Sequence, residues 1–179
     1  MKNIRLWLPG IALAGLISAG CMLISGQFTV VYTFADPINV VSPSALAGQV
    51  VDLNTISEYK DHKDNLKAVV DLAVLGKFTN LTSTNSAIEI WIVPSPGAAL
   101  TNDAAVRASG QKIWGPLNVA GNSSVNVTWD QSAALFTGRQ ALITEVKGDG
   151  VFALYALANG PYSFRINKGA FIAVISAGR

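Results

Sequence analysis

Alternation of side-chain type with a period of two is the pattern that most constrains the fold of this chain. In the first such segment, Phe28, Val30, Tyr32 and Phe34 alternate with Val and Thr residues, and isoleucine recurs at every second position of 88–92. Successive side chains of a β-strand point to opposite faces, so this spacing places the apolar residues on one face. The chain is therefore expected to fold mainly as half-buried strands.

Ten segments carry a strand pattern bounded by Gly, Pro, Asn or Asp. They are residues 28–34, 49–53, 68–80, 87–93, 112–119, 124–129, 140–147, 151–158, 162–167 and 170–177. Segments 151–158 and 170–177 are apolar on both faces, which predicts interior positions in a sheet. Glycines near 148–150, at 160 and at 169 supply the backbone freedom that tight hairpin turns require.

Segment 68–80 is expected to be a long strand, with Gly76 as a candidate bulge. Its hairpin partner is expected at 87–93, because the intervening residues 81–86 have the length and polarity of a hairpin loop. Alternating apolar residues of the first strand are predicted to share one face: Ala68, Val70, Leu72, Val74 and Phe78.

Helical signals are few and short. The charged segment 58–67 is expected to be an exposed turn or a single helical turn. Residues 101–109 are compatible with a short helix capped by Thr101 or Asn102 and ended by Gly110, or with a loop. A further short helix is predicted at 131–137, with Asp130 as its N-cap and Gly138 after its end.

Together these patterns predict an all-β fold. The favoured architecture is an antiparallel, immunoglobulin-like β-sandwich of about eight to ten strands with one or two short helices, forming a single domain over residues 28–179. The Cys-Trp-Cys pattern of true immunoglobulin domains is absent from the sequence. A small closed barrel is the alternative architecture.

The N-terminus has the order of features found in a secretory signal. Lys2 and Arg5 precede an apolar stretch, and the small residues Ser18, Ala19 and Gly20 lie directly before Cys21, the single cysteine of the chain. The apolar stretch is shorter than the roughly 20 residues that span a bilayer. Residues 1–20 are therefore interpreted as a signal peptide and not as a membrane-spanning helix.

The run ending at Cys21 resembles the lipobox of bacterial lipoproteins. This resemblance implies that the Cys21 thiol receives a diacylglycerol, that cleavage occurs before Cys21, and that the new amino group is acylated. Residues 21–27 would then form a lipidated tether, and the membrane would be bound through the lipid. Met22 after the cysteine implies transfer to the outer membrane if the cell has two membranes. The alternative is an uncleaved N-terminal anchor in which Cys21 is a small apolar residue.

The charge balance gives no indication of a nucleic-acid partner. The chain has 13 Lys and Arg residues against 11 Asp and Glu, and Lys2 and Arg5 belong to the predicted signal peptide. The remaining residues are therefore balanced in charge, unlike a basic nucleic-acid-binding domain. With Cys21 modified, no disulfide is possible, so packing alone must stabilise the domain.

Catalytic motifs are weak, so an enzyme is not expected. His62 is the single histidine, and no Gly-x-Ser-x-Gly motif is present. Residues Glu58, Asp61, His62 and Asp64 are interpreted as a solvated contact loop. Glu58, Asp61 and Asp64 have a spacing of three that would suit a calcium-type site on a helical turn, but Lys60, Lys63 and Lys67 neutralise the segment. Neither a bound metal nor a cofactor is expected.

Three tryptophans offer a further possibility. Trp91, Trp114 and Trp129 lie in predicted strands, where packing is favoured over a sugar-stacking platform. The sequence therefore predicts a lipid-anchored cell-envelope protein with a non-catalytic role in binding, adhesion or structure. The alternatives are an accessory subunit that binds an envelope protein through an exposed strand edge, a carbohydrate- or metal-binding module, and an enzyme.

Overall fold

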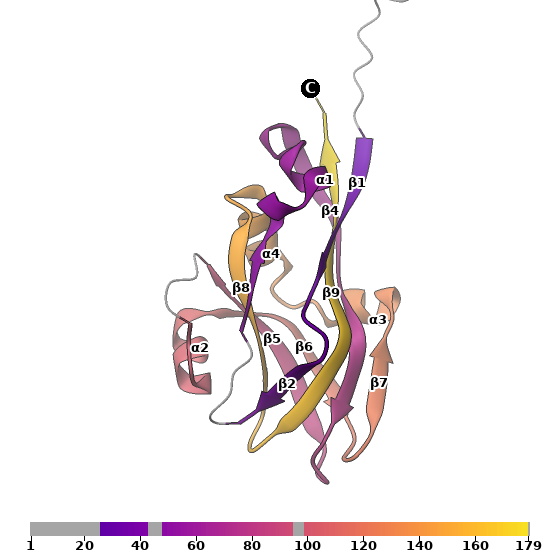
Figure 1. Ribbon diagram of the computed structural model, residues 1–179, viewed down its shortest axis with the longest axis vertical. Helices are drawn as coiled ribbons and strands as arrows, with labels where there is room; N and C mark the ends of the chain where they lie inside the picture. The colour runs from indigo at the N-terminus through magenta and orange to yellow at the C-terminus, as the bar shows by residue number, and fades with distance from the viewer. Residues whose placement is uncertain (1–25, 43–47, 95–98, 179) are drawn as a thin grey trace, which may run out of the picture.

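The computed structural model describes residues 26–42, 48–94 and 99–178, so the predicted signal peptide and Cys21 lie outside the described residues. Its strands form two antiparallel sheets, which confirms the predicted all-β class (Figure 1). The first sheet has the order β1–β9–β4–β7, with β2 also paired to β9. It comprises β1 (Gly26–Thr33), β2 (Ile38–Val41), β4 (Leu66–Asn80), β7 (Ser124–Val127) and β9 (Ser163–Ala177).

The second sheet has the order β3–β8–β5–β6. It comprises β3 (Gln49–Asp52), β5 (Ser86–Pro94), β6 (Gln111–Val119) and β8 (Val151–Ala158). No strand pairing joins the two sheets within the described residues, so they pack as two layers and not as one closed barrel. The immunoglobulin-like arrangement remains a prediction.

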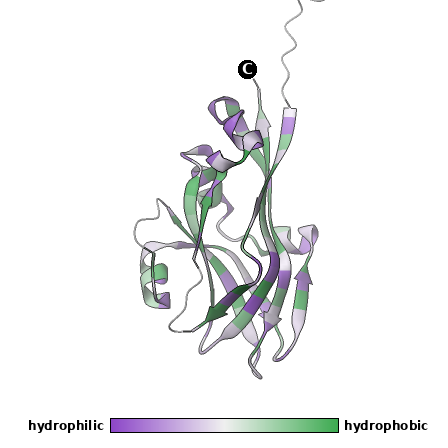
Figure 2. Cartoon of the chain, in the orientation of Figure 1, coloured by the Kyte–Doolittle hydropathy of each residue, from purple (hydrophilic) through white to green (hydrophobic). Residues whose placement is uncertain are grey.

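The core lies between the inner faces of the two sheets. Strand β8 is hydrophobic along most of its length, whereas α1 (Ser57–Lys60) is largely hydrophilic (Figure 2). As predicted, β8 and β9 are interior strands, each with a neighbour on both sides. The largest fully buried side chains include Trp114, Tyr59, Phe78, Phe152, Phe164 and Phe171.

Residues 162–167 and 170–177 were predicted as separate strands, and this prediction is wrong. They form the single long strand β9, which pairs with β4 through a register shift opposite Leu75 and Lys77. Lys168, with a φ of 51°, supplies the left-handed residue at this irregularity. A left-handed residue suits a bulge as well as a turn, so the local signal does not distinguish the two.

The strand predicted at 140–147 is also wrong, because these residues form helix α4 (Arg139–Lys147). Leu142 and Val146 are one helical turn apart and are both fully buried. Helix α4 follows α3 (Trp129–Leu135) and contacts β4, β5, β6 and β8. The two helices therefore complete the core between the sheets.

The predicted hairpin between segments 68–80 and 87–93 is not formed. Strands β4 and β5 belong to different sheets, and the chain between them turns a corner from one layer to the other. The fully buried Asn80 fixes this corner. Its Nδ2 group donates to the carbonyl oxygens of Thr84 at 2.7 Å and Val119 at 3.1 Å, and its Oδ1 atom accepts from the Thr82 N–H at 3.0 Å.

Strand β4 does not keep one alternating face along its whole length. Its pairing with β9 shifts register between Leu66 and Ala68 and again between Val69 and Asp71. Val69 consequently packs against the core, whereas Val70 is 42% exposed. The prediction that Ala68 and Val70 share the buried face of Leu72 is therefore wrong, and the cause is an extra residue at each bulge.

The short helices α2 and α3 lie close to the positions predicted from the sequence. Helix α2 (Asp103–Ser109) begins after Asn102, whose Oδ1 atom accepts a hydrogen bond from the Ala105 N–H at 2.8 Å, and Gly110 is its C-cap. Helix α3 begins after Thr128 instead of the predicted Asp130, and the Thr128 N–H donates to the Gln131 side chain at 3.0 Å.

Candidate functional site

The predicted contact loop folds as α1, followed by the 3-10 turn η2 (Lys63–Asn65). Glu58, Asp61 and Asp64 are exposed, as the charge density predicts. The exception in α1 is Tyr59, which is 1% exposed and donates its hydroxyl to the Val146 carbonyl oxygen at 2.8 Å. Burial raises the pKa of the Tyr59 hydroxyl. Tyr59 therefore fastens a polar loop to the core through α4.

His62 is half-buried and stacks on Phe28 of β1. The two ring centroids are 3.7 Å apart, and the planes differ by 21°. Among the described residues, no hydrogen bond joins the imidazole to a hydroxyl or a carboxylate, so His62 lacks the orienting partner that a general base uses. His62 therefore contacts the start of β1.

The acidic residues of the loop do not converge. Within the described ranges, no group of three His, Cys, Asp or Glu residues is placed so that it could hold a metal ion. Glu58 instead accepts a hydrogen bond from the neighbouring Ser57 hydroxyl at 2.9 Å. The spacing of three among Glu58, Asp61 and Asp64 therefore does not create a shared ligand set.

The contact loop, the start of β1 and the end of β9 lie together at one end of the sandwich (Figure 1). Phe28 contacts His62, and the Gly178 N–H donates to the Asn65 carbonyl oxygen at 3.2 Å. The first described residue, Gly26, is therefore at the same end as the loop. In the part of the chain that the structure describes, no helix combines the length and the hydropathy needed to cross a bilayer.

A charged cluster that the sequence patterns did not predict lies on the outer face of the second sheet. Glu89 of β5 is 7% exposed, and its carboxylate is 3.2 Å from an Arg107 nitrogen and 3.1 Å from Lys112 Nζ. The Trp91 indole N–H also donates to Glu89, at 3.2 Å. The Arg107 guanidinium lies over the Trp91 ring, 5.1 Å from its centroid. Glu89, Arg107, Lys112 and Trp91 are named the Glu89 cluster.

The Glu89 cluster holds α2 on the second sheet. Burial raises the pKa of Glu89, but hydrogen bonds from Lys112, Trp91 and Arg107 outweigh that effect, so its pKa is lower than usual. Beneath the helix, Val106 packs in a small second core with Ala153, Tyr155 and Leu157. The signal for this face was present in the sequence, because Glu89 and Trp91 occupy the same face of a predicted strand.

The three tryptophans do not form a stacking platform. Trp114 is fully buried, and its indole N–H donates to the Ser132 carbonyl oxygen at 3.1 Å. Trp91 belongs to the second sheet, whereas Trp129 begins α3 and donates to Asp71 of the first sheet at 2.8 Å. Trp129 was predicted to lie in a strand, and that prediction is wrong.

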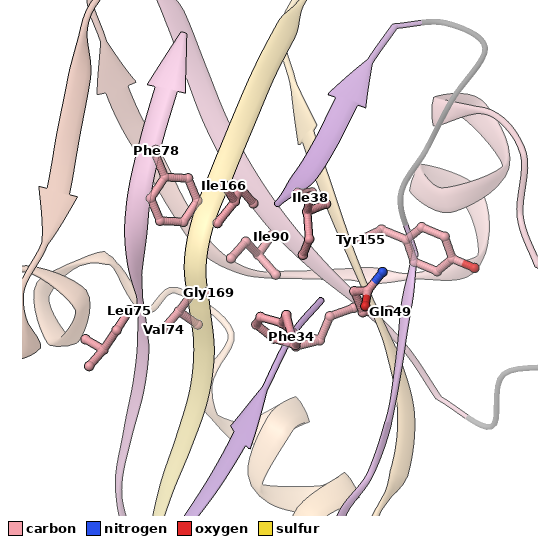
Figure 3. Close-up of a pocket in the computed structure, with 12 residues that line it drawn as sticks. Phe34, Ile38, Gln49, Val74, Leu75, Phe78, Ile90, Tyr155, Ile166 and Gly169 are labelled. Carbon is pink, nitrogen blue, oxygen red and sulfur yellow. The ribbon is translucent and has the colours of Figure 1, made fainter. Parts of the chain in front are cut away.

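An apolar pocket penetrates between the two sheets (Figure 3). Its walls include Phe34, Ile38 and Ile166 from the first-sheet side and Ile90 and Leu154 from the second. The cavity volume is about 30 Å³, whereas one water molecule requires about 10–15 Å³ on the same measure. The pocket is therefore too small for a bulky ligand unless its side chains move.

The chain matches no protein-family model and no curated protein sequence. The contacts of the candidate site residues hold elements of the fold together. Tyr59 joins α1 to α4, and the Glu89 cluster attaches α2 to the second sheet, while the exposed carboxylates of the contact loop face solvent.

Proposed function

We propose that this chain is a lipid-anchored cell-envelope protein whose β-sandwich has a non-catalytic role in binding or structure. The observation that carries the proposal is the run Ser18-Ala19-Gly20-Cys21, which follows a short apolar stretch and a basic start. Two or more acyl chains on one terminus are sufficient for stable attachment, because each buried methylene contributes about 0.8 kcal/mol.

The position of β1 supports a short link between Cys21 and the folded domain. Gly26 begins β1 and lies five positions after Cys21. A fully extended chain covers about 3.3–3.6 Å per residue, so the start of β1 would be at most about 18 Å from the modified cysteine. The contact loop, which packs on Phe28, would then be the part of the sandwich nearest the membrane, available for contacts with lipid headgroups or envelope proteins.

The surroundings of the reactive side chains favour a non-catalytic role. His62 stacks on Phe28, and the buried Ser132 hydroxyl accepts a hydrogen bond from the Val74 N–H at 2.7 Å. Nucleophilic catalysis by serine requires a hydroxyl hydrogen-bonded to a base. These two side chains instead have structural contacts in different parts of the domain.

Metabolic labelling with a radioactive fatty acid tests the anchor. The wild-type chain should incorporate label and fractionate with membranes, and Cys21→Ser should lose the label. Ser25→Ala, a change in the tether that keeps the cysteine, should behave as wild type. Bacterial lipoprotein signals usually carry Leu where this chain has Ser18, so Ser18→Leu should increase the cleaved fraction. Label retained by Cys21→Ser would refute the proposal.

A further inference from the structure

Strand β1 is an edge strand of the first sheet, and none of the strands that the structure describes pairs with its outer side. It pairs with β9 without a register shift from Gly26 opposite Ala177 to Thr33 opposite Ala170. The Phe34 N–H donates to the Gly169 carbonyl oxygen at 2.9 Å, which continues this ladder by one residue. Because hydrogen-bonded positions alternate in antiparallel pairs, the even-numbered residues bond to β9.

The odd-numbered residues of β1 therefore direct their N–H and C=O groups away from β9. These residues are Gln27, Thr29, Val31 and Thr33, and all of them are exposed. Among the described residues, no hydrogen bond to another element occupies these backbone groups. Half of the backbone groups of an eight-residue strand are thus available for a further ladder.

The other edges of the two sheets are short or covered. Strands β2, β3 and β7 have four residues each, and the Val50 carbonyl oxygen of β3 accepts the Tyr32 hydroxyl at 2.7 Å. Beyond the end of β7, helices α3 and α4 cover the edge of β4. Arg139 of α4 donates a hydrogen bond to the Val70 carbonyl oxygen of β4 at 2.7 Å.

Strand β6 is the other long edge, and it is interrupted. It contains Pro116, which has no N–H to donate, and its register with β5 shifts twice. The N–H groups of Thr137 and Gly138 both donate to the Ile113 carbonyl oxygen, at 2.9 and 3.1 Å. By contrast, β1 has no proline, no charged residue and no bulge, which are the usual features that prevent strand addition.

We propose that the open edge of β1 pairs with β1 of a second copy of this chain, antiparallel, about a two-fold axis through Val30. This register places Thr29 opposite Val31 and Gln27 opposite Thr33. It is the symmetric register that uses all the outward backbone groups, because each odd-numbered residue meets another odd-numbered residue. The first sheets of the two copies then form one continuous sheet.

A second copy suits this edge because the strand is complementary to itself. The segment Gly26–Thr33 carries no charge, so symmetric pairing brings no like charges together. Val31, which is 45% exposed, would be covered by Thr29 of the second copy. The inference goes beyond the proposed function and does not require Cys21, since every residue in it belongs to β1.

Co-purification of two differently tagged full-length copies from detergent extracts tests the proposal. Wild-type copies should co-purify and sediment as a dimer. Val31→Lys in both copies should weaken association by about tenfold or more, because the two lysines would lie diagonally across the new ladder. Thr29→Pro should also prevent association, and its monomer should fold, because the N–H that it removes points to solvent.

Two further combinations separate pairing from misfolding. Val41→Lys changes an equally exposed valine on β2 and should leave the dimer intact, since Val41 is 42% exposed and lies outside the proposed ladder. A copy with Val31→Lys mixed with a copy carrying Val31→Glu should regain association. Wild-type copies that sediment as monomers, or a Lys and Glu pair that associates no better than two Lys copies, would overturn the proposal.

Discussion

The hydroxyl oxygen of Ser132 accepts a hydrogen bond from the backbone N–H of Val74 at 2.7 Å, and both groups are buried. Strand β7 pairs with β4 only from Gly76 to Thr79, so the edge of β4 is without a strand neighbour at Val74. Helix α3 covers this edge, and Ser132 supplies the acceptor that a strand would have provided. The Trp114 indole N–H also lies 3.2 Å from the same hydroxyl.

Ser132→Ala should destabilise the fold by about 1–3 kcal/mol, because the buried Val74 N–H loses its acceptor. Urea unfolding followed by tryptophan fluorescence measures this change. Ser124→Ala is the matched control, since the bond between Ser124 and Thr79 is exposed, and it should change stability by less than about 0.5 kcal/mol. Equal stability of the two variants would contradict the assigned role of Ser132.

Asn80→Asp should cost about 3 kcal/mol or more at neutral pH. The Asn80 amide donates to the carbonyl oxygens of Thr84, Val119 and Ala120, and a carboxylate placed there would have no hydrogen to donate and would remain buried. Thermal unfolding measures the loss. The exposed Asn126→Asp is the control and should leave the melting temperature nearly unchanged. A tolerated Asn80→Asp would show that the corner between the sheets does not depend on this amide.

Glu89→Gln should reduce stability at pH 7 by roughly 1–2 kcal/mol, because charge-assisted hydrogen bonds become neutral ones while Arg107 and Lys112 remain partly solvated. The folded-state pKa of Glu89 lies below 4.5, the usual value for a glutamate carboxyl. The contribution of this carboxylate is therefore complete above that value and is lost as the pH falls through the folded-state pKa.

The difference in unfolding free energy between wild type and Glu89→Gln should consequently shrink as the pH is lowered from 7 to about 3. Denaturant titrations across this range measure the difference. Asp64→Asn, which changes an exposed carboxylate of the contact loop, should track the wild type. A difference that grows toward low pH would contradict the lowered pKa.

Two glycines with positive φ should respond differently to alanine. Gly160 has a φ of 72° and open space around its Cβ position, so Gly160→Ala should cost only the left-handed conformation, about 1–2 kcal/mol. Gly115 has a φ of 100°, and an added Cβ would lie 2.5 Å from the Ile88 carbonyl oxygen. Gly115→Ala should therefore cost more, about 2–5 kcal/mol. Equal melting temperatures would refute the close approach of β6 to β5.

Side-chain periodicity was sufficient to predict the all-β class and most strands, because burial on one face leaves an alternating pattern in β1 and β5 and burial on both faces leaves an apolar run in β8. It failed at α4, where the burial of Leu142 and Val146 depends on contacts with both sheets. It also failed at Val70, because a bulge changes the face of every following residue without changing composition. A loop of hairpin length did not predict which strands pair, because the chain at Asn80 turns from one sheet to the other and forms no hairpin.

The candidate site was predicted only in part. Charge density was enough to locate the exposed loop around Asp61, but nothing local indicated that Tyr59 would be buried against Val146. The Glu89 cluster joins β5, α2 and β6, so its members are distant in sequence and meet only in the folded chain. Groups assembled by tertiary packing leave only weak local signals, and for Glu89 that signal is its position with Trp91 on one face of a strand.

Intact mass spectrometry of the full-length chain extracted from membranes tests the anchor most directly. The expected product is a polypeptide that begins at Cys21 and carries the added mass of a diacylglycerol and an amide-linked acyl chain. A polypeptide that begins at Cys21 without lipid, or one that retains residues 1–20, would contradict it.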